Sequence, residues 1–174
     1  VWMASTTTGW AVGEVGLINH TTDGGATWTP QSSGTTENLN GVWGVDASNV
    51  WAVGTSGTIL HWDGSTWSKQ TSSTAKDLLA IHGVNATNAW AVGPTKTIVY
   101  WNGTAWASQP APPGGGSYDL QGVFAADATN VWAVGTGGVI LKWNGSVWNT
   151  QTSGVTGTLN GVWGTAANNV WALG

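Results

Sequence analysis

Short apolar runs alternate with polar turns along the whole chain, and the alternation follows one pattern. Each copy has a short apolar strand, a four-residue polar turn and a second strand that ends in Trp-Ala-Val-Gly or a close variant. The copies begin at Val1, Val42, Ile81, Val123 and Val162. A fixed period of about 40 residues indicates a supersecondary unit that buries its faces only by stacking against copies of itself.

The second repeat shows the predicted unit most clearly. Residues 42–45 and 50–53 form two apolar strands joined by a turn of Asp, Ala, Ser and Asn, and residues 58–62 form a third strand. Asp63-Gly64 then predicts a tight hairpin, because a type I′ turn needs positive φ at both central positions. A more polar fourth strand follows at residues 65–70. No segment of the chain has the period of a helix.

The central strands are apolar on both faces, while the hairpins require antiparallel pairing. A small antiparallel sheet covers both faces when it packs between two sheets like itself. We therefore predict an all-β fold, a β-propeller of four-stranded antiparallel blades. The polar fourth strand suits the outer rim, where an exposed edge must resist pairing with other chains. A β-solenoid and a sandwich are the alternatives.

The repeats divide the 174 residues into one propeller domain or propeller fragment. The predicted units are residues 1–41, 42–80, 81–122, 123–161 and 162–174, which makes four full repeats and half of a fifth. The chain starts and stops within the pattern, so we expect a longer array, and self-association through the incomplete blade is one partner hypothesis. The segment Pro110 to Ser117 interrupts the pattern and is predicted to be a surface loop.

Composition narrows the function classes. Only 7% of the residues are charged, the formal net charge is −4 and arginine is absent, which argues against nucleic acid and anionic membrane surfaces as partners. Cysteine is absent and no apolar run has the length of a membrane span. We expect no membrane insertion. A surface rich in Gly, Thr, Ser, Asn and Trp is typical of secreted and cell-surface bacterial β-proteins.

Tryptophan and glutamine recur at fixed places in the repeat. The second-strand set (Trp10, Trp51, Trp90, Trp132, Trp171) and the fourth-strand set (Trp28, Trp67, Trp106, Trp148) are predicted to pack between blades. The candidate ligand-binding residues lie at the hairpins and just after the fourth-strand Trp: Trp62, Asp63, Trp101, Asn102, Trp143, Asn144, Gln70, Gln109 and Gln151. The rings suit sugar stacking, but a hairpin pair such as Trp62 with Trp67 is the favoured interpretation. An edge-strand hydrogen bond is likewise favoured over a ligand pocket for the glutamines, including Gln31.

The titratable residues do not form a recognisable catalytic or metal set. His20 and His61 share one repeat position, which Tyr100 and Lys142 occupy later, and His82 replaces a first-strand Trp. We expect no metal and no cofactor. The acids fall mostly at turns, and no nucleophile-elbow pattern occurs. The sequence predicts a protein that is not an enzyme.

The hairpin of the first repeat is longer than the others and reads Thr-Thr-Asp-Gly-Gly-Ala-Thr-Trp over residues 21–28. It resembles the Asp-box (BNR) motif of bacterial sialidases and other propellers. Together with Gly9 to Gly13 and Gly16 to His20, it resembles the repeat of photosystem II assembly factor-type propellers. These resemblances imply a propeller fold. Sialidase activity would need three arginines, which this chain lacks.

Two function classes follow for a propeller without catalysis. One is an extracellular or cell-surface binding or protein-interaction module, which includes lectin-like recognition of neutral glycans. The other is a purely structural scaffold or a subunit of a surface assembly. A chaperone-like assembly factor is a third hypothesis, although such factors present a basic patch that a chain without arginine lacks.

Overall fold

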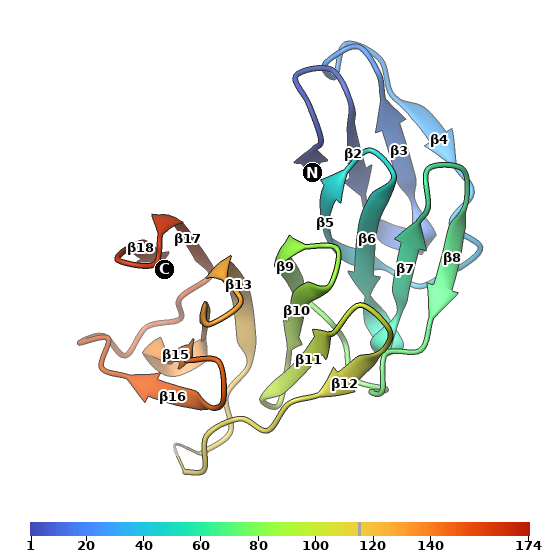
Figure 1. The fold of residues 1–174 in the computed structure, drawn as a ribbon. Helices are drawn as coiled ribbons and strands as arrows, with labels where there is room; N and C mark the ends of the chain where they lie inside the picture. The colour runs from blue at the N-terminus through green and yellow to red at the C-terminus, as the bar shows by residue number, and fades with distance from the viewer. Residues whose placement is uncertain (115) are drawn as a thin grey trace.

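The computed structural model describes residues 1–114 and 116–174, and these residues form five antiparallel β-sheets (Figure 1). Within each sheet the strands follow chain order, so each sheet is a meander. The predicted all-β class and the four-stranded antiparallel units are therefore confirmed. The last sheet has two strands.

The strands are grouped below into blades 1 to 5. Blade 1 has β1 (Trp2–Met3), β2 (Gly9–Val12), β3 (Ile18–Thr21) and β4 (Thr29–Gln31). Blade 2 has β5 (Leu39–Asp46), β6 (Asn49–Gly54), β7 (Ile59–Trp62) and β8 (Trp67–Gln70). Blade 3 has β9 (Ala80–Asn85), β10 (Asn88–Gly93), β11 (Thr97–Trp101) and β12 (Trp106–Ser108). Blade 4 has β13 (Leu120–Asp127), β14 (Asn130–Gly135), β15 (Ile140–Trp143) and β16 (Trp148–Gln151), and blade 5 has β17 (Gly161–Ala166) and β18 (Asn169–Leu173). Three short 3₁₀ turns, η1 (Glu14–Gly16), η2 (Thr55–Gly57) and η3 (Thr136–Gly138), join second and third strands.

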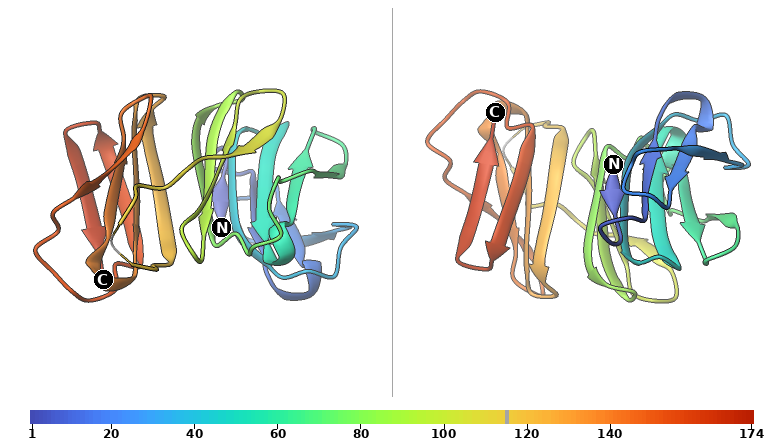
Figure 2. Two further views of the ribbon diagram at one scale, coloured as in Figure 1. Left: turned by 90° about the horizontal axis from the view of Figure 1, so that it is seen from below. Right: turned by 90° about the horizontal axis from the view of Figure 1, so that it is seen from above.

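The blades follow one another around an arc, with the first strand of each blade on the inside and the fourth at the rim (Figure 1). Seen edge-on, the sheets stand side by side at similar height (Figure 2). One side of this disc carries the tight hairpins within blades, and we call it the hairpin side. The other side carries the segments that run from one blade to the next, and we call it the linker side.

The first strand of blade 2 is longer than the predicted residues 42–45. It begins at Leu39, which pairs with Gly54 across a register shift and is 3% exposed. The strand extends because Leu39 belongs to the apolar cluster that lies between blades 1 and 2.

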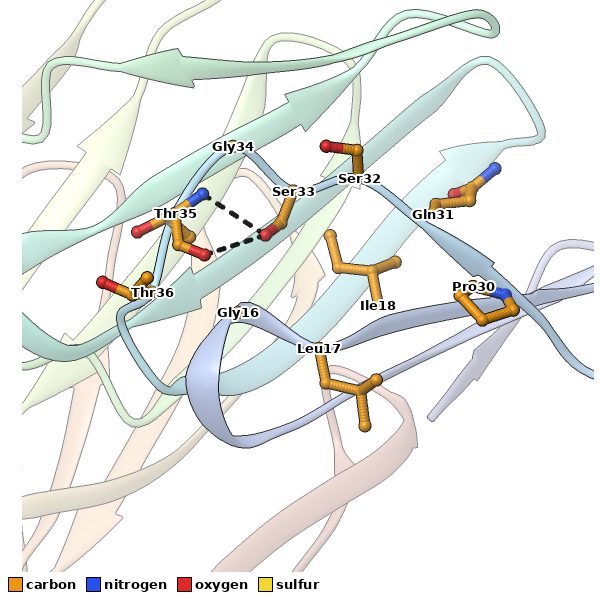
Figure 3. Close-up of a pocket in the computed structure, with 10 residues that line it drawn as sticks. All are labelled: Gly16, Leu17, Ile18, Pro30, Gln31, Ser32, Ser33, Gly34, Thr35 and Thr36. Atoms are coloured by element: carbon orange, nitrogen blue, oxygen red, sulfur yellow. Dashed lines mark hydrogen bonds between the residues drawn. The ribbon is translucent and has the colours of Figure 1, made fainter.

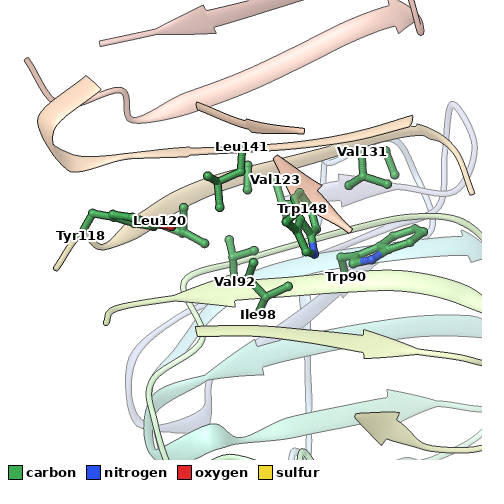
Figure 4. Close-up of a cluster of buried hydrophobic side chains, with 11 residues drawn as sticks. Trp90, Val92, Ile98, Tyr118, Leu120, Val123, Val131, Leu141 and Trp148 are labelled. Carbon is green, nitrogen blue, oxygen red and sulfur yellow. The ribbon is translucent and has the colours of Figure 1, made fainter. Parts of the chain in front are cut away.

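Three apolar clusters form the core, and each lies at a boundary between blades. At the boundary of blades 3 and 4, Trp90, Val92 and Ile98 of one blade face Val131, Leu141 and Trp148 of the next (Figure 4). The hydrophobic core of this chain is therefore a series of interfaces between sheets, as the repeat predicts.

Trp10, Trp51 and Trp90 belong to these clusters, and the exposed fractions of the second-strand tryptophans of blades 1 to 4 do not exceed 9%. Trp171 differs from this prediction, because no further sheet packs on β18 among the described residues and the ring is 48% exposed. Trp28 also differs. It precedes β4 instead of lying within it and is 37% exposed, since the hairpin of blade 1 is two residues longer than the others.

An aromatic row crosses blades 1 to 3 on the face that meets the next blade. In blade 2 the row consists of Trp43, Trp51 and His61, which lie opposite one another on neighbouring strands. The ring centroids are 5.8 Å apart for Trp43 and Trp51 and 4.5 Å apart for Trp51 and His61. Such cross-strand pairs stabilise the sheet in addition to burying apolar surface.

The first strand of the next blade makes room for this row with a glycine. A Cβ added at Gly83 would lie 2.6 Å from Cη2 of Trp43 and 2.6 Å from the Asn88 carbonyl oxygen. The same arrangement places Gly44 beside Trp2 and Gly164 beside Phe124. The first strands approach closely because these positions carry no side chain.

We predict that Gly83→Ala destabilises the protein by about 1–3 kcal/mol, because the added methyl group overpacks the contact with Trp43. Urea unfolding followed by tryptophan fluorescence measures the change. Gly157→Ala is the matched control, since nothing lies within 4 Å of its Cβ position. Equal stability of the two variants would contradict the close-packing argument.

Candidate functional site

The predicted site residues lie at the outer rim, where the third and fourth strands of blades 2 to 4 end in a hairpin. Trp62 of β7 pairs with Trp67 of β8, and the ring centroids are 5.7 Å apart. The same pair recurs as Trp101 with Trp106 at 5.6 Å and as Trp143 with Trp148 at 5.7 Å. The favoured hairpin pairing is therefore the arrangement observed.

The third-strand ring of each pair also holds the hairpin to the turn between the first and second strands of its own blade. Nε1 of Trp62 donates a hydrogen bond to the Ala47 carbonyl oxygen at 3.1 Å. Trp101 and Trp143 donate in the same way to the carbonyl oxygens of Ala86 and Ala128. These indoles therefore tie together the two turns on the hairpin side of each blade.

The predicted turn residues hold the hairpin loops. Oδ1 of Asp63 accepts hydrogen bonds from the backbone N–H groups of Ser65 and Thr66, both at 2.8 Å. Asn102 and Asn144 accept equivalent bonds in blades 3 and 4. Hydrogen bonds from Thr66 and Ser65 lower the pKa of Asp63 to about 2. This carboxylate therefore stays ionised and serves the turn.

The long hairpin of blade 1 is organised around Asp23. Thr27 donates to this carboxylate through its hydroxyl at 2.6 Å and through its N–H at 2.9 Å, and the Thr21 hydroxyl donates at 2.8 Å. These bonds, with those of Thr27 largest, lower the pKa of Asp23 to about 2. The eight-residue loop is a compact turn closed by its own side chains.

The repeated glutamines connect neighbouring blades. Oε1 of Gln70 accepts a hydrogen bond from Nε1 of Trp106 in the next blade at 2.8 Å, and Gln109 accepts one from Trp148 at 2.8 Å. Gln31 accepts from Trp67 at 2.9 Å and from Trp10 at 3.1 Å. The sequence pointed to an edge-strand bond, and the structure shows that the partner lies across the blade boundary.

Gln151 has a different environment from the other three glutamines. Its side chain is exposed, and its Nε2 donates to the neighbouring Thr150 carbonyl oxygen at 3.2 Å. The structure therefore brings Gln70 and Gln109 to the Trp pairs of the next blade but leaves Gln151 at the rim of blade 4.

Two kinds of recess open beside these elements. A rim pocket of about 390 Å³ lies between blades 1 and 2, and its lining includes Gln31, Trp62, Ser65, Thr66 and Trp67. It combines half-buried aromatic rings with hydroxyl groups and an amide. Asp63 does not line it.

The second kind of recess lies on the linker side and was not predicted from the sequence. In blade 1 it has a volume of about 690 Å³ and is built from the turn after β2 and the segment after β4 (Figure 3). Blades 2 and 4 have equivalent recesses beside Gly57 and Gly138. The signal that was available is a Ser two residues after each of three glutamines, at Ser33, Ser72 and Ser153.

In blade 1 this recess is shaped by Gly16 and Ser33, which bring the turn after β2 and the segment after β4 together. Gly16 has a φ of +70°, and a Cβ there would lie 2.1 Å from the Thr35 carbonyl oxygen. The Ser33 hydroxyl donates to the same carbonyl oxygen at 3.2 Å. The serine thus turns the linker toward the blade, and the recess remains beside the turn (Figure 3).

The histidine position shared by blades 1 and 2 is explained by contact with the second-strand tryptophan. His20 lies 4.6 Å from Trp10 and His61 lies 4.5 Å from Trp51, measured between ring centroids. Tyr100 lies 4.9 Å from Trp90 in a tilted arrangement, and Nζ of Lys142 lies 5.0 Å from the Trp132 ring centroid. Burial lowers the pKa of both histidines.

Within residues 1–114 and 116–174, no group of three or more His, Cys, Asp or Glu side chains is placed to hold a metal ion. The same part of the chain has no helix that is long and apolar enough to cross a membrane.

His82 makes a contact that the sequence did not predict. Its ring lies between Trp43 and Phe124, with centroid distances of 5.8 and 5.0 Å. Nδ1 accepts a hydrogen bond from the Ala125 N–H of the next blade at 3.2 Å. Burial lowers the pKa of His82 to about 4, so the ring is neutral at pH 7.

Comparisons with known proteins give structural likeness but no sequence family. No protein-family model matches the chain, and no curated protein matches its sequence. A structure of YCF48 bound to D1 peptide is 20% identical, with a TM-score of 0.72 over 98% of this chain and 58% of that one. YCF48 from Cyanidioschyzon merolae is 21% identical, with a TM-score of 0.70 over 95% of this chain and 60% of that one.

The β-propeller domain of Myceliophteria thermophila Cps50 (Swd1) is 10% identical, with a TM-score of 0.73 over 99% of this chain and 60% of that one. This chain spans about three fifths of the length of these structures. The likenesses confirm the predicted β-propeller architecture. They also match, at the level of fold, the resemblance to photosystem II assembly factor-type propellers.

We predict that Gln70→Leu destabilises the protein by about 1–3 kcal/mol, because Nε1 of the buried Trp106 loses its acceptor. Urea unfolding measures this change. Gln151→Leu is the matched control and should alter stability by less than about 0.5 kcal/mol, since that side chain is exposed. A large loss in the control would contradict the assignment of these roles.

We also predict a pH dependence that comes from His82. Its folded pKa of about 4 lies below the ordinary 6.5, so the unfolded chain binds more protons between these values. The contribution of neutral His82 to the free energy of unfolding is therefore fully present above pH 6.5. It falls by up to about 3 kcal/mol as the pH drops to 4.

The substitution His82→Phe isolates this effect, because Phe124 occupies the same place in blade 4. The variant should lose less stability than the parent protein between pH 7.5 and 4.5 in urea unfolding. It should be less stable at pH 7.5, since the Ala125 N–H then lacks its acceptor. An unchanged pH profile would show that His82 is not the group responsible.

Proposed function

We propose that this chain is a non-enzymatic propeller module that binds other proteins. Extended segments of the partner would bind at the rim and in the linker-side recesses of this chain. The observation that carries this proposal is the set of open recesses on the linker side of blades 1, 2 and 4, where Ser, Thr and Gly residues make up most of the lining. Such surfaces offer many weak polar contacts along a line, which suits an extended polypeptide better than a compact substrate.

Two further observations support a role without catalysis. The hairpin carboxylates of Asp23 and Asp63 are used by their own turns, and the described residues hold no metal-type cluster. A structural neighbour, YCF48, is described with a bound D1 peptide. This supports protein binding and favours the assembly-factor hypothesis more than composition alone did.

Recognition of neutral glycans is a second candidate, favoured by one feature. The rim pocket between blades 1 and 2 places the half-buried Trp62 and Trp67 beside the hydroxyls of Ser65 and Thr66. Aromatic rings next to hydroxyl and amide groups suit a sugar ring. A location outside the cell or at its surface belongs to this proposal and rests on composition.

We also propose that the hairpin of blade 1 is an Asp-box-type hairpin. The loop of residues 21–28 is closed by Thr21, Asp23 and Thr27 side chains, which supports its interpretation as an Asp-box-type hairpin with a structural role. The alternative function is a structural scaffold that binds no ligand, and a binding assay distinguishes it from the binding module.

The purified protein can be tested on an array of ten-residue peptides, charged and uncharged, and on a glycan array. We expect micromolar binding to a subset of peptides, with an intact response in Trp62→Ala. Binding to neutral sugars alone, lost in Trp62→Ala, would overturn the protein-binding function in favour of the glycan candidate. No binding on either array would support the scaffold alternative.

A further inference from the structure

The outer strands β4, β8, β12 and β16 are each the last strand of a sheet and have one free edge. Free backbone N–H and C=O groups on such an edge are a template for another extended chain. Alternate residues of an antiparallel strand direct these groups outward. In blade 3 the Gln109 N–H donates inward to the Ile98 carbonyl oxygen at 2.9 Å, so Ser108 and Pro110 face outward.

Three of the four edges carry a residue that opposes strand addition. The outward position equivalent to Ser108 is Pro30 in β4 and the exposed Lys69 in β8. In blade 3 the next outward residue is Pro110, which has no N–H to donate. Proline and lysine are the residues with which proteins commonly block their edges.

The edge of β16 has neither residue. Its outward positions are Thr150 and, just beyond the strand, Thr152, and both have a free backbone donor and no charge. The Thr150 carbonyl oxygen accepts from the Gln151 side chain at 3.2 Å, which shows that it faces away from β15. The β16 edge is therefore open to an incoming strand.

A recess adjoins the end of this edge and has a wall that its counterpart lacks. The recess of blade 4, about 510 Å³, is lined by the turn after β14, by residues after β16, and by Gly114, Ser117 and Tyr118 of the preceding linker. The recess of blade 2, about 550 Å³, is lined by residues of blade 2 and its own following segment. The extra wall consists of Gly114 and Ser117, from the inserted segment Pro110 to Ser117, and of Tyr118, which follows it; Gly115 lies outside the described residues.

Lys96 holds the wall in place. Its Nζ donates to the Gly114 carbonyl oxygen at 2.7 Å and lies 4.7 Å from the centroid of the Tyr118 ring. Lys96 itself has a φ of 62°, at a place where the other blades have glycine. At Gly57 a Cβ would lie 2.1 Å from the Thr74 carbonyl oxygen. A side chain fits at Lys96 because the inserted linker takes another path, so the insertion and the lysine form one built feature.

The chemistry of the lining indicates what the recess takes. None of its lining residues is charged. Hydroxyl groups come from Ser117, Thr136 and Thr152, and apolar surface comes from Val139 and Val155. We propose that an extended, uncharged peptide segment adds to the β16 edge as a fifth strand of blade 4 and continues into this recess. This inference rests on the proposed protein-binding function and names its site and ligand class.

Strand addition makes the backbone the main source of affinity. The decisive variant is therefore Thr150→Pro, which removes an outward N–H and breaks no bond within the sheet, as Pro30 shows in β4. Ser108→Pro makes the same change at the equivalent outward position of β12, whose edge already carries Pro110, and is the matched control. Urea unfolding and circular dichroism establish that both variants are folded.

The probes are the uncharged ten-residue peptides of the array, made from Ser, Thr, Val, Ile, Tyr, Asn and Gln, and the same peptides N-methylated at alternate residues. Dissociation constants are measured by fluorescence anisotropy. We expect at least tenfold weaker binding for Thr150→Pro, no change for Ser108→Pro, and loss of binding on N-methylation. Hydrogen exchange at the Thr150 and Thr152 amides should slow in the complex.

Undiminished binding to Thr150→Pro would overturn this site and leave the proposed function standing, as would binding of charged peptides alone. Self-association of the parent chain that Thr150→Pro abolishes in sedimentation would identify a second copy as the occupant and overturn the peptide proposal. A chain that binds no peptide at all would overturn this inference together with the proposed function.

Discussion

The contact between an aromatic ring on the first strand of one blade and a small residue on the first strand of the next is the constraint on which the rest of the structure depends. Trp43 packs beside Gly83 and Phe124 beside Gly164. The smaller ring of His82 meets Ala125 instead. Ring size and available space therefore vary together around the arc, and each boundary stays closely packed.

Polar groups reinforce this packing at a greater distance from the centre. The Gln70–Trp106 and Gln109–Trp148 hydrogen bonds join neighbouring blades near the rim. On the linker side, Oδ1 of Asp77 accepts from the Ser56 N–H, and Oδ1 of Asp119 accepts from the Thr95 N–H. Each aspartate belongs to the linker that leaves a blade. It accepts a hydrogen bond from a backbone N–H in the turn between the second and third strands of that same blade. The residues that recur in every repeat thus hold neighbouring blades together or close hairpins within a blade, and function is better sought where one blade departs from the others.

Blade 4 and its preceding linker are the main departure. The insertion replaces the short linker seen between blades 1 and 2, and Lys96 replaces the glycine that such a linker requires. The neighbouring β16 lacks the proline or lysine that the other rims carry. The inserted linker and the β16 edge both adjoin one recess, which lies in blade 4. In a fold built from near-identical units, such a local change alters the surface of one blade without disturbing the interfaces of the others.

The sequence by itself determined the repeat, the antiparallel strands and the hairpin turns. These features depend on local alternation and on turn residues such as Asp63 and Gly64, whose effects reach only a few positions along the chain. It also indicated that Trp62 pairs with Trp67, since the two flank a tight turn. Only the tertiary structure decided which residues meet across a blade boundary. The Gln70–Trp106 bond, the place of His82 beside Ala125 and the exposure of Trp171 all depend on the neighbouring sheet. That sheet lies about forty residues away along the chain, beyond the reach of any local pattern.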